Sequence, residues 1–183
     1  TNFMGEMLLL GTRSRSKEQI DLALDQMGAR LEVETRAEAF IIRGAVISSQ
    51  LEPFLKLVTE IITEPSFPEA EMRKLKSEIV SGILEELGHD PSLSSRRFTT
   101  FLFRDHPYGN TILGKRADVE GLTRDTVAAH YDRLIRDKNL LVVGTGDAQE
   151  IAIAAWTGVI GKARAGTGAA AVITQVAAPQ DAP

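Results

Sequence analysis

The sequence predicts an α+β fold, with helices packed on one face of a mainly antiparallel sheet. Two observations favour it. Segments with the apolar periodicity of helices recur along the chain, and alternating apolar residues between two of them indicate a strand pair. The 183 residues are 43% hydrophobic and 25% charged, which is ordinary for a globular protein and sufficient for one core.

The first complete helix begins with a capping-box pattern, in which Ser16 is followed three residues later by Gln19. Its apolar face consists of Ile20, Ala23, Leu24 and Met27, and Gly28 ends it. Leu31, Val33 and Thr35 then alternate with charged residues, which is typical of a half-buried strand. Residues 39–47 are expected to be its hairpin partner.

Two further helices precede the middle of the chain. Ser49 with Glu52 is expected to cap the first, whose stripe is Leu51, Phe54, Leu55, Val58, Ile61 and Ile62. Pro68 suits the first turn of a long helix that runs to about Leu87. The Asp90-Pro91 pair ends this helix and starts the next one.

The last part of the predicted domain again combines a helix, a strand and a helix. Thr123 should cap a helix with inward-facing Val127, Tyr131, Leu134 and Ile135. Residues 140–143 read as a buried strand, and Asp147 should cap the last helix.

Composition shifts near the end of the chain. We expect residues 1–160 to form the domain and the Ala/Gly/Pro-rich residues 161–183 to be a connector or tail, in which residues 171–176 could form one short strand. The net charge of −4 offers no basic face for a phosphate backbone, so nucleic acid is excluded as a partner. Cysteine is absent, and neither a membrane span nor a signal peptide is visible.

The segment from Asn2 to Thr12 resembles a zinc-peptidase helix whose metal ligands are missing. In the inverted motif H-x-x-E-H, two histidines four residues apart share one zinc ion, and the glutamate deprotonates the metal-bound water. The three corresponding positions hold Asn2, Gly5 and Glu6. Asparagine is a poor zinc ligand, glycine has no side chain, and Glu6 alone cannot complete a tetrahedral site.

Five blocks in order extend the resemblance. They are Glu64-Pro65-Ser66-Phe67, His106-Pro107-Tyr108-Gly109, Ile112-Leu113-Gly114, Leu122-Thr123-Arg124-Asp125 and Asn139-Leu140-Leu141-Val142-Val143-Gly144. Over roughly residues 1–150 the chain resembles the insulinase/pitrilysin family of zinc metallopeptidases, which includes the mitochondrial processing peptidase. Family members place a strand before this point, so the resemblance implies that the chain is a piece of a longer protein and lacks the first strand of the domain.

The resemblance also places the third metal ligand of the family, a glutamate on the long helix, at Ile83 within one residue. Ile83 continues the apolar stripe of Met72, Leu75 and Ile79 and cannot bind zinc. We therefore expect this chain to have no catalytic, cofactor-binding or metal-binding residue. We also expect Gly5→Glu to be tolerated or stabilising, because glycine is unfavourable inside a helix.

The remaining candidate groups have simpler interpretations. His89, His106 and His130 do not have the spacing of metal ligands, and structural or solvent-facing roles are expected for them. Glu85-Glu86 reads as a solvated helix end. Asp105 with His106 has no serine or cysteine nucleophile to complete a dyad.

Three functional hypotheses follow. In the family, a zinc-bearing half or subunit pairs with a similar half that lacks zinc, and the two enclose a peptide. The resemblance therefore implies a non-catalytic domain that helps to bind peptide beside a zinc-bearing homologous partner, with zinc only in that partner. The alternatives are a purely structural scaffold subunit and an active zinc metalloendopeptidase with unrecognised ligands.

Overall fold

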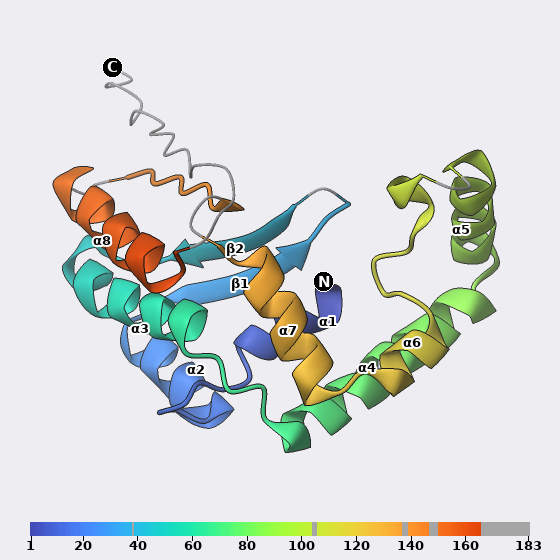
Figure 1. Cartoon of the computed structure of the whole chain (residues 1–183), viewed down its shortest axis with the longest axis horizontal. Helices are drawn as coiled ribbons and strands as arrows, with labels where there is room; N and C mark the ends of the chain where they lie inside the picture. The colour runs from blue at the N-terminus through green and yellow to red at the C-terminus, as the bar shows by residue number, and fades with distance from the viewer. Residues whose placement is uncertain (38, 104–105, 137–138, 147–149, 166–183) are drawn as a thin grey trace.

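A computed structural model describes residues 1–37, 39–103, 106–136, 139–146 and 150–165. In chain order the elements are α1 (Asn2–Leu8), α2 (Lys17–Gln26), β1 (Arg30–Thr35), β2 (Phe40–Ala45), η1 (Ser48–Gln50), α3 (Leu51–Thr63), α4 (Glu69–Gly88), α5 (Asp90–Phe103), η2 (Pro107–Gly109), α6 (Arg116–Gly121), α7 (Arg124–Leu134) and α8 (Glu150–Ala163). Helices and an antiparallel hairpin together confirm the α+β class. Figure 1 shows α5 standing at the far end of the long α4, and α8 beside α3.

The hairpin forms at the predicted place. β1 and β2 pair antiparallel, with Val33 opposite Ile42 and Thr35 opposite Phe40. This register turns the apolar residues of β1 toward the helices, and α1 and α2 both pack against β1. The strand that was expected over residues 39–47 is confirmed, with somewhat shorter bounds.

The start of α2 follows the sequence pattern closely. The hydroxyl of Ser16 accepts from the backbone N–H of Gln19, and the Gln19 side chain accepts from the backbone N–H of Ser16 at 2.8 Å. Gly28 follows the helix with φ of +58°, in the left-handed region that favours glycine. The predicted capping box and helix end are confirmed.

The predicted cap of α3 is wrong. The chain enters this helix through the 3₁₀ turn η1, in which the N–H of Gln50 bonds to the carbonyl of Ile47 at 2.9 Å. Because the turn delays the first α-helical residue, Gln50 takes the N-cap position and Ser49 does not cap. The apolar stripe itself is confirmed, because Phe54, Val58, Ile61 and Ile62 are buried.

The core lies where α1, α3, α4 and α7 meet the hairpin. Its most deeply buried apolar side chains are Met7, Leu8, Ile20, Ile61, Ile83, Val127 and Tyr131. These residues come from α1, α2, α3, α4 and α7, so one hydrophobic cluster joins most of the domain. α4 begins after Pro68, which sits at the N-cap, and ends before the Asp90-Pro91 start of α5, close to the predicted bounds.

Residues 140–143 do not form the predicted buried strand. Leu141 is 61% exposed and Val143 is 53% exposed, and only Val142 has a bridge-type pairing. An apolar run becomes a buried strand only when neighbouring strands and helices cover it. Within the described residues the sheet consists of β1 and β2 alone, so this cover is missing.

The C-terminal helix is tied to the domain by two side chains. Trp156 Nε1 donates to the carbonyl of Leu55 at 3.1 Å and to the Thr59 hydroxyl at 2.7 Å, which joins α8 to α3. Arg164 donates to the carbonyl of Ile135 at 3.0 Å and to Asp132 at 2.9 Å. α8 therefore continues through the expected domain boundary at residue 160 and ends at Ala163.

Two expectations near this helix fall outside the described residues, namely the Asp147 cap and the strand over residues 171–176. Among the described residues, no helix is both long enough and apolar enough to cross a membrane.

Tyr131 fastens α7 to α3. Its side chain is 2% exposed and its hydroxyl donates to the carbonyl of Ile62, while Phe67 meets its ring edge-on with the centroids 5.6 Å apart. The guanidinium of Arg164 lies 4.6 Å from the ring centroid. Burial raises the pKa of Tyr131 to about 12, so the phenol is neutral and keeps its hydrogen bond at ordinary pH.

Candidate functional site

Helix α1 carries Asn2, Gly5 and Glu6, the three positions that correspond to the H-x-x-E-H zinc motif in the resemblance. Asn2 and Glu6 lie one turn apart on the same face, and the Asn2 amide donates to the Glu6 carboxylate at 2.8 Å. Both side chains are partly buried. The structure therefore brings these two predicted positions together, and their polar atoms satisfy each other.

Gly5 lies against the hairpin. A Cβ built on Gly5 would lie well under 3.0 Å from Cε2 of Phe40 and 3.0 Å from Cγ1 of Val33. Real Cβ atoms do not approach other atoms that closely, so a side chain at position 5 must displace the Phe40 ring. The prediction that Gly5→Glu is tolerated or stabilising therefore requires the partly exposed Phe40 ring to move, because tertiary packing opposes the helix propensity that suggested it.

Ile83 completes the set of predicted positions. It is 1% exposed on α4, in line with Met72, Leu75 and Ile79, and α4 packs against α1. The predicted apolar stripe is confirmed. A carboxylate at this position would have to be buried among apolar groups, which is costly without a cation partner.

The donor set at these positions does not fit zinc. A zinc site takes three or four nitrogen, sulfur or oxygen ligands, whereas Asn2, Gly5, Glu6 and Ile83 offer one carboxylate that already accepts from an amide. Elsewhere in the described residues, no group of three or more His, Cys, Asp and Glu could hold a metal ion.

The histidines lie apart from one another. His89 contacts the hydroxyl of Ser92 at 2.8 Å, and His106 packs against Tyr108 with the ring centroids 4.6 Å apart. His130 lies between the Thr1 hydroxyl at 3.1 Å and Arg133 at 2.9 Å. Burial, followed by the nearby charge of Arg133, lowers the pKa of His130, which keeps the ring neutral near pH 7.

The predicted solvated helix end at Glu85-Glu86 holds for Glu85 but not for Glu86. Glu86 pairs with Arg96 at 3.1 Å across the corner between α4 and α5, while Glu85 is exposed. Asp105 lies outside the described residues.

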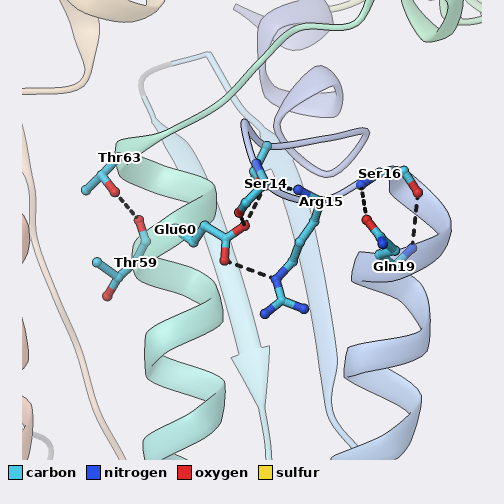
Figure 2. A network of polar contacts seen from close by, with 8 residues as sticks. Ser14, Arg15, Ser16, Gln19, Thr59, Glu60 and Thr63 are labelled. Atoms are coloured by element: carbon cyan, nitrogen blue, oxygen red, sulfur yellow. Dashed lines mark hydrogen bonds and ion pairs between the residues drawn. The ribbon is translucent and has the colours of Figure 1, made fainter.

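One polar cluster near α1 has no counterpart in the sequence interpretation. Figure 2 shows Glu60 of α3 directed at the loop between α1 and α2, where its carboxylate meets Ser14 and Arg15. The hydroxyls of Ser14 and buried Thr12 each donate to it at 2.5 Å, and Arg15 Nε donates at 3.0 Å. Thr12 in turn accepts from the backbone N–H of Arg15 at 2.9 Å, so Glu60 fixes the loop that follows α1.

The electrostatics of Glu60 follow from these contacts. Burial by itself raises the pKa of Glu60, but the hydrogen bonds from Ser14, Thr12 and Arg15 together outweigh it and lower the pKa. The carboxylate is therefore charged at neutral pH. No sequence signal could have found this cluster, because Glu60 is separated from Thr12 by 48 residues.

Comparisons with known proteins agree with the motif blocks. The family model described as insulinase (peptidase family M16) matches residues 1–116. An uncharacterized zinc protease of Rickettsia bellii is 26% identical over 152 residues, which cover 82% of this chain and 37% of that protein. The mitochondrial-processing peptidase subunit beta of Neurospora crassa is 22% identical over 151 residues, covering 79% of this chain and 30% of that protein.

The fold also has a solved counterpart. An inactive peptidase M16 domain from Pseudomonas fluorescens superimposes with a TM-score of 0.85 at 20% identity, covering 94% of this chain and 42% of that chain. The present chain spans about a third of the length of the curated relatives it matches. Because the family model covers more than half of the residues, the chain belongs to the insulinase family, peptidase family M16.

Proposed function

We propose that this chain is a non-catalytic domain that helps to enclose and bind a peptide substrate beside a zinc-bearing homologous half or subunit. One observation carries the proposal. The positions of the zinc motif hold Asn2, Gly5 and Glu6, and the ring of Phe40 takes the space that a catalytic side chain at position 5 would need.

The relatives support this role. The Pseudomonas fluorescens domain, which has the same fold, is called inactive, and the Neurospora crassa relative is by name one subunit of a processing peptidase.

The hairpin offers one route for peptide binding. Within the described residues β1 and β2 pair only with each other, and an edge that the expected upstream strand leaves open has backbone groups that can accept an extended peptide. The chain would then contribute backbone hydrogen bonds and enclosure, while the partner would contribute the zinc-activated water.

The first test concerns the metal. We expect the purified chain, after dialysis against a zinc-free buffer, to retain far less than one zinc per chain, because a stable site needs three or four ligands. Metal analysis by mass spectrometry checks this. Near-stoichiometric zinc after dialysis would instead support an active metallopeptidase with unrecognised ligands.

The second test concerns the partner. A family member from the same genome that carries an intact H-x-x-E-H motif is purified and assayed with fluorogenic peptides, alone and with this chain. We expect no chelator-sensitive cleavage by the chain alone and a rise of about tenfold or more in kcat/KM when both are present, a barrier change of about 1.4 kcal/mol. A stable complex without any rise would favour the scaffold role.

A further inference from the structure

We draw no further inference here: the strongest candidate, the outward face of α5 on which Phe98, Phe101 and Leu102 are exposed, carries none, because nothing in the part of the chain that the structure describes shows what covers it.

Discussion

The ring of Phe40 covers Gly5. The two residues lie on different elements, β2 and α1, and the ring stands where a Cβ at position 5 would begin. The absence of a side chain at Gly5 therefore leaves the space that the aromatic ring on the hairpin fills. The glycine at the position where the resemblance places a glutamate and the packing of the hairpin on α1 therefore belong to one contact.

The Gly5–Phe40 contact predicts that Gly5→Ala destabilises the domain when Phe40 is present and stabilises it when Phe40 is replaced by alanine. Gly5→Ala should destabilise the domain by about 1–3 kcal/mol through overpacking, although alanine favours helix by about 1 kcal/mol. In a Phe40→Ala background the same substitution should stabilise it by up to about 1 kcal/mol. Urea unfolding of the four proteins measures the coupling, and equal effects in both backgrounds would disprove the contact.

Neighbouring residues on α4 give a matched pair. Ile83→Glu should cost several kcal/mol, because a carboxylate at a 1% exposed position has no cation to pair with. Leu84→Glu, at a position that is 50% exposed, should change stability by only about 0.5 kcal/mol. Thermal melting distinguishes them, and similar melting temperatures for the two variants would place Ile83 outside the core.

The Glu60 cluster predicts both a stability and a pH effect. Glu60→Ala should cost about 2 kcal/mol, because Thr12, Ser14 and Arg15 lose a charged acceptor. Glu52→Ala on the same helix, which removes an exposed ion pair with Lys56, should change stability far less, because water and salt screen exposed pairs.

The pH dependence of Glu60 has a defined sign. Because the pKa of Glu60 is lowered in the folded protein, its stabilising contribution is complete above the ordinary value of 4.5 and disappears as the pH falls through the folded-state pKa. The unmodified protein should therefore lose more stability than Glu60→Ala between about pH 5 and pH 3. Parallel losses in the two proteins over that range would contradict the assignment.

Tyr131 predicts an effect at the opposite end of the pH scale. Its pKa is raised from 10.0 to about 12, so its contribution is present below pH 10 and is lost as the pH rises toward 12. Tyr131→Phe should cost about 1–2 kcal/mol at pH 7, since the Ile62 carbonyl loses its donor, and should remove that alkaline loss.

The other tyrosine supplies the control for Tyr131. Tyr108→Phe, at a position that is 36% exposed, should leave in place the alkaline loss of stability that Tyr131 causes. Unfolding curves between pH 7 and pH 12 compare the two variants. An alkaline loss that persists in Tyr131→Phe would have to come from other groups.

Features that depend on near neighbours could be predicted from the sequence. The Ser16 capping box, the end of α2 at Gly28 and the stripe containing Ile83 each involve residues within a few turns of one another. The family and the α+β class followed from several such local patterns in order.

Features that depend on distant residues could not be predicted. Phe40 on β2 contacts Gly5 on α1, and Glu60 contacts Thr12, which is 48 residues away in sequence. No local sequence pattern predicts either contact. The prediction of a buried strand over residues 140–143 was wrong for a related reason. Their apolar character suits a strand, but burial requires neighbours that local sequence does not specify.

The hydrogen bonds of Trp156 give this protein an intrinsic optical reporter. It is the only tryptophan in the chain, and its indole N–H is held between two acceptors on α3 about a hundred residues away in sequence. Emission excited selectively from tryptophan therefore originates at the junction of α3 and α8. Its wavelength and quenching can follow the docking of the last helix separately from the unfolding of the rest of the domain, without any added label.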